Sequence, residues 1–229
     1  MAIKFSHTRV HDSVCRACSF LPVCLSKSRL ANACTENRTP PQDYALDTGY
    51  HLTEPNDPLF YLYIIRTGSC KQYAITAAGK ETIIDFYLPG EVIGFDALYQ
   101  QKFHHFTTTL ESTFVCRIKF NELKQILAQD AAVNSYVLEL MSQKLLARSS
   151  IQQQQSAESR LLAFLSHMRQ RACKTNHHST LKLSMSRADI GNYLNLTTET
   201  ISRIFTRLQK NGYLEVSKKL IKFTCEDEA

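Results

Sequence analysis

Long hydrophobic runs are missing from this 229-residue sequence. No apolar stretch approaches the roughly 20 residues that a helix needs to cross a bilayer, so the sequence predicts no membrane-spanning segment. The first fifteen residues are polar and lack the apolar core of a secretion signal, and we therefore expect a cytoplasmic protein. With 44% hydrophobic and 21% charged residues, the composition is typical of one or two globular domains that can bury a sizeable core.

Cysteine is plentiful by contrast, since the chain has eight. Three of them, Cys15, Cys18 and Cys24, lie within the ten residues "CRACSFLPVC". In a reducing compartment, such thiols are more naturally free, redox-active or metal-bound than joined in disulfides. Three thiols cannot complete a site of four thiolates, so a fourth ligand must come from elsewhere in the chain.

The residues alone do not select that fourth ligand, because Cys34, Cys70 and Cys116 are all available. With Cys34, the three N-terminal thiols could form a local zinc site, which would be redox-silent. The CxxC pair by itself is equally typical of a zinc half-site or a redox pair. Cys116 lies in the apolar run "TFVCRIKF" and could simply be a small buried hydrophobic residue.

The pattern changes character along the chain and predicts an α+β protein. Residues 1–41 hold the cysteines and a polar linker that ends in two prolines. Residues 42–120 contain short β-rich runs broken by turns, typical of a small antiparallel barrel whose last strand runs from about Phe106 to Ile118. Residues 121–155 have helical periodicity, and residues 156–229 form a further domain.

An apolar stripe follows the helical segment in alternating steps of four and three residues. Such a stripe is the seam of a paired long helix if it is exposed, and a core face if it is not. The candidate dimer contacts on and beside it are Val133, Val137, Leu140, Met141, Lys144, Leu145, Arg148 and Ile151. The polar run of residues 152–155 ends the stripe, and Ser156 is a candidate N-cap for the next helix.

The stretch "SMSRADIGNYLNLTTETISRIFTRLQKNGYLEV" predicts two capped helices joined by a tight turn. Ser186 can cap the first helix with Asp189 as its reciprocal partner, and Thr197 can cap the second. Asn211 and Gly212 supply a left-handed stop after the second helix. Two capped helices with this spacing indicate a helix-turn-helix.

The polar face of the second helix carries Glu199, Ser202 and Arg203 near its start. Arg can donate a fork to guanine, Glu can accept from a cytosine amino group, and Ser can do either. The segment from Ser186 to Lys222 has seven basic residues against three acidic ones, which favours a polyanionic partner. Together with the helix-turn-helix, this excess predicts double-stranded DNA as the partner. A hairpin with a basic tip follows and can contact phosphates. The candidate DNA-binding residues are Arg187, Thr197, Thr198, Glu199, Ser202, Arg203, Lys218 and Lys219.

Four stretches together, "LYIIRTGSCKQYAIT", "LPGEVIGFDAL", "ESRLLAFL" and "IGNYLNLTTETISRIFTRLQKNGYLEV", resemble the CRP/FNR superfamily of bacterial regulators, specifically its oxygen-sensing FNR branch. The resemblance covers nearly the whole chain. It implies an N-terminal β-roll sensor, a long dimerisation helix in a homodimer and a C-terminal winged helix-turn-helix. It also implies that Glu199, Ser202 and Arg203 read half-sites similar to TTGAT in a palindrome.

The same resemblance implies a cofactor. The FNR branch binds a [4Fe-4S] cluster through three N-terminal cysteines and one from the β-roll, which selects Cys15, Cys18, Cys24 and Cys116. Oxygen attack on the cluster would then free the N-terminal tether and weaken the dimer. Familiar members carry an acidic residue on the dimer helix, whereas this chain has Arg148. Because like charges of either sign repel across a two-fold axis, Arg148 could serve the same purpose; alternatively, it lies away from the axis and the dimer is constitutive.

The resemblance also bears on partners. It implies contact with RNA polymerase through a loop at residues 76–80. Members that bind cyclic nucleotides follow a Gly-Glu pair with an Arg that grips the phosphate; here Gly90 and Glu91 are present, but "QKFHHFTTTL" has no Arg, so no cyclic nucleotide is expected. The alternative is a regulator of the same architecture that senses zinc, thiol oxidation or a small ligand.

An enzyme is the alternative from a different class. His104 and His105, in the same region as Cys116, could suggest metal chemistry or a nucleophile–base pair. The sequence supplies no orienting carboxylate and no recognisable nucleophile motif for them. We therefore expect a binding protein and no enzyme.

Overall fold

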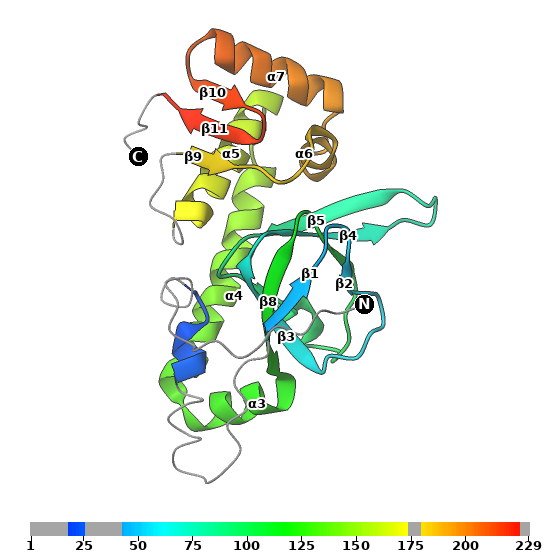
Figure 1. Cartoon of the computed structure of the whole chain (residues 1–229), viewed down its shortest axis with the longest axis vertical. Helices are drawn as coiled ribbons and strands as arrows, with labels where there is room; N and C mark the ends of the chain where they lie inside the picture. The colour runs from blue at the N-terminus through cyan, green and yellow to red at the C-terminus, as the bar shows by residue number, and fades with distance from the viewer. Residues whose placement is uncertain (1–17, 26–42, 174–179, 225–229) are drawn as a thin grey trace. The chain divides into compact units, whose positions relative to one another are not determined.

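The computed structural model describes residues 18–25, 43–173 and 180–224 (Figure 1). The chain divides into two compact units. The first comprises the residues up to Ala74 together with Phe86–Lys144, and the second comprises Ile75–Asp85 together with Leu145–Ala229. Within the described ranges, no helix is both long enough and apolar enough to cross a membrane.

The β-rich region of the chain contains two four-stranded sheets, with strand orders β1-β8-β3-β6 and β2-β7-β4-β5. The strands are β1 (Asp43–Leu46), β2 (His51–Thr53), β3 (Tyr61–Thr67), β4 (Cys70–Ile75), β5 (Glu81–Tyr87), β6 (Val92–Ile93), β7 (Phe106–Thr109) and β8 (Thr113–Lys119). A short 3-10 helix, η1 (Phe95–Ala97), follows β6. The antiparallel pairings of β8 with β1 and β3 confirm the expected β-roll class of fold.

The expectation of a single last strand from Phe106 to Ile118 is wrong, because this stretch forms two strands that lie in different sheets. The chain turns at residues 110–112, and the hydroxyl of Thr113 then donates to the carbonyl of Glu111 at 2.8 Å. Gly68 lies so close to Thr113 that a Cβ there would collide with it, and its φ of +85° is one that L side chains rarely adopt. The close approach of these two turns separates β7 from β8.

The helical segment expected from residue 121 is also divided, into α3 (Phe120–Gln129) and α4 (Ala131–Gln152). Asp130 leaves the helical conformation with φ −125° and ψ 95°, which ends α3. Its carboxylate then accepts the backbone N–H of Val133 at 3.1 Å and so caps the start of α4. One aspartate therefore makes the break that hydrophobic periodicity alone did not indicate.

The apolar stripe on α4 packs, in its first half, against the core of its own chain. Val133 and Val137 are buried with Leu62 and Ile118 of the β-strands, and Leu140 and Met141 pack against the same cluster. Three other leucines of α4 are largely exposed: Leu138 by 59%, Leu145 by 74% and Leu146 by 68%. The core-face reading therefore holds for the first half of the stripe.

The second unit contains α5 (Ala157–Cys173), β9 (Thr180–Lys182), α6 (Arg187–Leu194), α7 (Thr198–Lys210), β10 (Leu214–Ser217) and β11 (Leu220–Phe223). The expected hairpin is present, and β9 adds a third strand that the sequence did not reveal, in the order β10-β11-β9. The N-cap predicted at Ser156 is confirmed, because its hydroxyl accepts the N–H of Ser159 at 3.0 Å.

Candidate DNA interface and cysteine segment

Helices α6 and α7 form the helix-turn-helix, and their local signals are confirmed. Ser186 and Asp189 make both hydrogen bonds of a capping box at the start of α6. Asn195 ends α6 with φ +55°, in the left-handed region. The Thr197 hydroxyl accepts the N–H of Thr200 at 3.1 Å and caps α7. The turn therefore begins with the left-handed backbone of Asn195 and ends with the side-chain cap of Thr197.

Gly191 is a residue of α6, packed against this turn, that sequence reasoning missed. Its carbonyl accepts the N–H of Leu196 at 2.8 Å, and a Cβ at Gly191 would lie 2.7 Å from the carbonyl oxygen of Leu196. Only a residue without a side chain fits such a close approach of two backbone segments. Gly191 thus fixes how the two helices meet.

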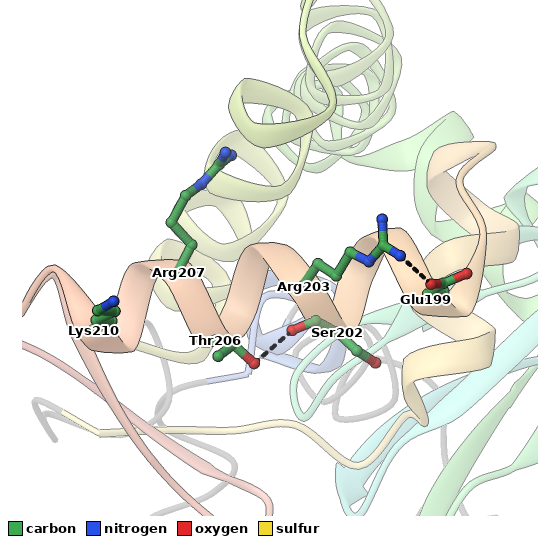
Figure 2. Close-up of a pocket in the computed structure, with 6 residues that line it drawn as sticks. All are labelled: Glu199, Ser202, Arg203, Thr206, Arg207 and Lys210. Atoms are coloured by element: carbon green, nitrogen blue, oxygen red, sulfur yellow. Dashed lines mark hydrogen bonds and ion pairs between the residues drawn. The ribbon is translucent and has the colours of Figure 1, made fainter.

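Helix α7 has one buried face and one exposed face. The buried face is the predicted apolar set of Ile201, Ile204, Phe205 and Leu208. The exposed face forms a shallow groove (Figure 2) whose residues are Glu199, Ser202, Arg203, Thr206, Arg207 and Lys210. The three residues predicted to read bases are therefore brought together on the open face.

The side chains of this groove interact with one another. Arg203 Nη2 pairs with the carboxylate of Glu199 one turn earlier on the helix. The Ser202 hydroxyl donates to the carbonyl of Thr198 at 2.9 Å, and the Thr206 hydroxyl donates to the carbonyl of Ser202 at 3.0 Å. At 78% and 71% exposure, Arg203 and Glu199 remain accessible to a ligand despite their pairing.

The other candidate DNA-binding residues have structural contacts as well. The Arg187 guanidinium lies over the ring of Phe205, 3.2 Å from its centroid, and its burial lowers the pKa of Arg187. Lys219 Nζ donates to the carbonyl of Ser184 at 3.1 Å, and Lys218 at the hairpin tip has φ +56°. The roles of these residues as DNA contacts remain predictions.

A β-hairpin belongs to the same unit as the helix-turn-helix, which the sequence did not indicate. The side-chain amide of Asn192 on α6 accepts the N–H of Ile83 and donates to the carbonyl of Glu81, both at 2.8 Å. Arg171 Nη1 lies 3.8 Å from the carboxylate of Asp85. The amide group of Asn192 thereby bonds to the backbone of β5 as a neighbouring strand would.

The cysteine segment is described from Cys18 to residue 25, and Cys15 lies outside the described residues. Cys18, Cys24 and Cys116 are half-buried and pack against one hydrophobic cluster. The backbone N–H of Phe20 donates to Cys18 Sγ at 3.4 Å. Among the described residues, no three His, Cys, Asp or Glu side chains meet closely enough to hold a single metal ion.

The remaining cysteines differ from these. Cys70 is fully buried, and desolvation, followed by the charge of Glu111, raises the pKa of Cys70 to about 12. Such a thiol is inert at neutral pH and is a poor metal ligand. Cys34 and Cys225 lie outside the described residues. Of the described thiols, Cys116 therefore suits the role of fourth ligand better than Cys70.

The cysteine segment is attached to two parts of its own unit. The hydroxyl of Tyr136 on α4 donates to the carbonyl of Ser19 at 2.7 Å, and the hydroxyl of Ser19 donates to the carbonyl of Gly90. Phe20 is fully buried and packs its ring 6.2 Å from that of Phe95. The residue next to Cys18 therefore contacts both the long helix and the loop before β6.

A polar network lies inside the β-rich region. Asp96 Oδ2 accepts from Gln72 Nε2 at 3.1 Å and lies 3.0 Å from His105 Nδ1. Asp96 is thus an orienting carboxylate for His105, and the expectation that none is present is wrong. Burial raises the pKa of Asp96, but the hydrogen bond and charge of His105 and the charge of Lys144 bring it below its usual value.

Lys144, a candidate dimer contact, also faces this network. Its Nζ lies 3.9 Å from the ring centroid of Tyr87 and donates to the carbonyl of Val92 at 3.5 Å. The Tyr87 hydroxyl in turn donates to Gln72 Oε1 at 3.2 Å. The side chain of Arg148 lies outside the described residues. Lys144 therefore interacts with its own β-strands.

Comparisons with known proteins agree with this architecture. Residues 159–227 match the Crp-like helix-turn-helix domain, and residues 45–130 match the cyclic nucleotide-binding domain. The chain is 35% identical over 216 residues to Electron transport regulator A of Shewanella oneidensis, covering 90% of this chain and 85% of that protein. It is 36% identical over 186 residues to the Fumarate and nitrate reduction regulatory protein of Salmonella typhi, covering 80% and 74%.

The fold itself matches that of FixK2 from Bradyrhizobium japonicum, with a TM-score of 0.72 at 24% identity over 81% of this chain and 93% of that one. This likeness shows the architecture, while the sequence identities show the family. A Crp-like helix-turn-helix implies a DNA-binding transcription regulator and no enzyme. The chain belongs to the CRP/FNR superfamily of transcription regulators and, within it, to the FNR-type branch.

Proposed function

We propose that the chain is a homodimeric regulator of anaerobic, oxygen-responsive genes, which reads a TTGAT-like palindrome and holds a [4Fe-4S] cluster. The observation that carries the proposal is the docking of Cys18, Cys24 and Cys116 on one core that also contains the first half of α4. The names of the relatives, which include a fumarate and nitrate reduction regulator, support anaerobic regulation.

The DNA-reading part of the proposal uses Glu199, Ser202 and Arg203. They lie on one open face at the start of α7, where a recognition helix meets base edges. The pairing of Arg203 with Glu199 holds both groups in place before DNA arrives. Replacing Arg203 by Lys removes the bidentate fork but keeps the charge, so we expect a loss of discrimination at the guanine of about 1–3 kcal/mol.

The cofactor part uses Cys15, Cys18, Cys24 and Cys116 as ligands. The described thiols fit in chemistry, since iron–sulfur clusters prefer Cys thiolates, and in environment, since all three are half-buried against apolar side chains. The thiolates of a four-iron cluster bind different irons, so they need not converge as the ligands of one ion do. When bound, such a cluster would supply an oxygen-labile joint between the N-terminal segment and β8.

The chain's own residues would connect that joint to α4. Phe20 and Val23 are fully buried in the cluster that contains Val133 and Val137 of α4. Release of the segment would expose this apolar surface to water. It would also remove the hydrogen bond from Tyr136 to Ser19. The conformation of α4 therefore depends on the docked state of the cysteine segment.

The homodimer part of the proposal uses the exposed face of α4. Leu138 and Leu145 are seven residues apart, so they lie on one side of the helix, and both are largely exposed in one copy of the chain. Because Val133, Val137 and Lys144 face the β-strands of their own chain, we assign the seam between two copies to Leu138 and Leu145.

Of two further partners found in the family, RNA polymerase is proposed for this chain and cyclic nucleotide is not. The exposed loop of residues 76–80 is the proposed contact with RNA polymerase. Cyclic nucleotide is not proposed, because the interior of the β-roll carries the carboxylate of Asp96, whose lowered pKa keeps it ionised. This carboxylate opposes an anionic phosphate there, and residues 92–110, which follow Gly90 and Glu91, contain no Arg to anchor one.

One experiment decides between the proposal and its alternative, a regulator that responds to zinc or thiol oxidation. Protein prepared without oxygen is analysed for iron, sulfide and visible absorption, beside Cys116→Ala and, as a matched control, Cys70→Ala. We expect a coloured protein that loses iron in Cys116→Ala but not in Cys70→Ala. Colourless wild-type protein that contains only zinc would favour the alternative.

A further inference from the structure

Arg207 shares the exposed face of α7 with Arg203 and Lys210, yet it is paired with a residue outside that helix. Its Nη2 binds the carboxylate of Glu158 in the first turn of α5, and 55% of the Arg207 side chain and 33% of the Glu158 side chain are exposed. Figure 2 shows Arg207 leaving α7 away from Ser202 and Thr206. The Arg207 guanidinium is thus drawn toward α5.

The position of Glu158 keeps its carboxylate in place. Glu158 lies two residues after the Ser156 cap, in the first turn of α5, where the unpaired backbone N–H groups attract negative charge. An anion that is held at a helix start in this way is a stable partner for Arg207. On the exposed face of α7, Arg203 is similarly paired with Glu199, which leaves the face with less positive charge than its sequence implies.

We propose that Glu158 is a positioning residue that holds Arg207 away from DNA phosphates and so limits binding that is independent of sequence. The inference rests on the proposed DNA interface and assigns a role to a residue outside it. Each phosphate that a protein neutralises adds about 0.9 to the slope of log K against log salt concentration. While Glu158 holds Arg207, this guanidinium neutralises no phosphate and adds nothing to the slope. Base reading by Glu199 and Arg203 is unaffected.

The test measures binding of the full-length protein, prepared without oxygen, to a random-sequence duplex at several salt concentrations. Because an exposed ion pair is weak, we expect Glu158→Gln to tighten this binding by up to about fivefold and to steepen the salt slope by up to about 0.9 for each protomer that contacts the duplex. Glu122→Gln is the matched control. Glu122 also forms an ion pair with a basic residue, Lys119, at 3.8 Å, and replacing Glu122 by Gln changes the net charge by the same amount. An unchanged or shallower slope in Glu158→Gln overturns the proposal.

A second pair of variants separates positioning from simple charge repulsion. In an Arg207→Ala background, we expect Glu158→Gln to have no effect on the slope, because no guanidinium remains to be released. If Glu158→Gln tightens binding equally with and without Arg207, Glu158 merely repels phosphates and the proposal is overturned. Failure of the proposed function looks different: wild-type protein would then bind no duplex, or Arg203→Ala would leave the affinity for a TTGAT palindrome unchanged.

Discussion

The helix-turn-helix and the cysteine segment differ in where their structure is encoded. The start of α6, the turn and the start of α7 are each fixed by residues close in sequence: the side chains of Ser186, Asp189 and Thr197, and the left-handed backbone of Asn195. The cysteine segment is a single helical turn whose partners, Tyr136 and Gly90, lie at least 71 residues away. Local structure is thus set by caps in one region and by distant contacts in the other.

This difference suits the two regions to different tasks. A recognition helix has to present the same face to every operator, and self-contained caps keep it rigid. A segment held by distant contacts can dock or undock as a unit, since few local bonds retain it when those contacts are lost. The following predictions test whether the two regions differ in this way.

The largest effect is expected for Phe20→Ala. Truncating a fully buried Phe costs about 3–5 kcal/mol, unless the segment undocks first and limits the loss. We expect faster hydrogen exchange in residues 18–25 and at the start of α4, measured by mass spectrometry. Leu25→Ala is the control, because Leu25 is exposed in the same segment. Equal exchange in both variants would contradict a segment held by distant packing.

Gly191→Ala tests the helix-turn-helix in the same manner. The added methyl group would meet the carbonyl oxygen of Leu196, and overpacking of this kind costs about 1–3 kcal/mol. We expect a lower free energy of unfolding by urea and weaker operator binding. Ala188→Ser on the exposed side of α6 is the control, with an expected change within about 0.5 kcal/mol. A fully stable Gly191→Ala variant would mean that the turn yields readily.

Asp96→Asn tests a buried polar contact inside the β-rich region, between residues that meet only on folding. The lowered pKa of Asp96 means that its carboxylate stabilises the fold above the unfolded pKa, and this contribution is lost as pH falls through the folded pKa. We expect a loss of about 1–3 kcal/mol at pH 7 in urea unfolding, and a smaller difference from wild type below about pH 4. Asp47→Asn, at an exposed position, should show neither effect.

The predictability of each region follows from the same distinction. The two helices of the helix-turn-helix, their caps and the buried face of α7 were predicted because each rests on residues within one or two turns. The break at Asp130, the division of the last strand into β7 and β8, and strand β9 were not predicted. The break at Asp130 rests on a local cap that the apolar periodicity does not reveal. The other two features depend on pairing between residues far apart in sequence, as Gly68 against Thr113 illustrates.

The candidate sites divide similarly. The exposure of Glu199, Ser202 and Arg203 followed from helical periodicity, whereas the pairing of Arg207 with Glu158 joins residues 49 positions apart. The stripe on α4 was correctly located, but periodicity could not decide which half meets the protein's own core. The carboxylate of Asp96 was missed as the partner of His105 because η1 and the residue before β7 meet only in the folded chain.

Asn192→Ala tests the hairpin contact of the second unit. It removes two hydrogen bonds to the backbone of β5, each worth about 0.5–1.5 kcal/mol. We expect faster amide exchange at Ile83 with little change in operator affinity. Gln209→Ala, at an exposed position on α7, is the control. If Ile83 exchanges at the wild-type rate in Asn192→Ala, the amide does not hold the hairpin in solution.

The smallest effect is expected for Lys218→Gly, where stability and binding should change in opposite directions. Lys218 has φ +56°, which costs an L residue about 1 kcal/mol and costs glycine nothing, so unfolding in urea should require up to about 1 kcal/mol more. Loss of the charge should make the salt slope of DNA binding shallower by about 0.9 for each protomer whose Lys218 contacts a phosphate. Lys218→Asn tolerates the same backbone conformation without the charge, so it should reproduce the change in slope. A gain in stability without a change in slope would remove Lys218 from the DNA interface and leave it as a turn residue alone.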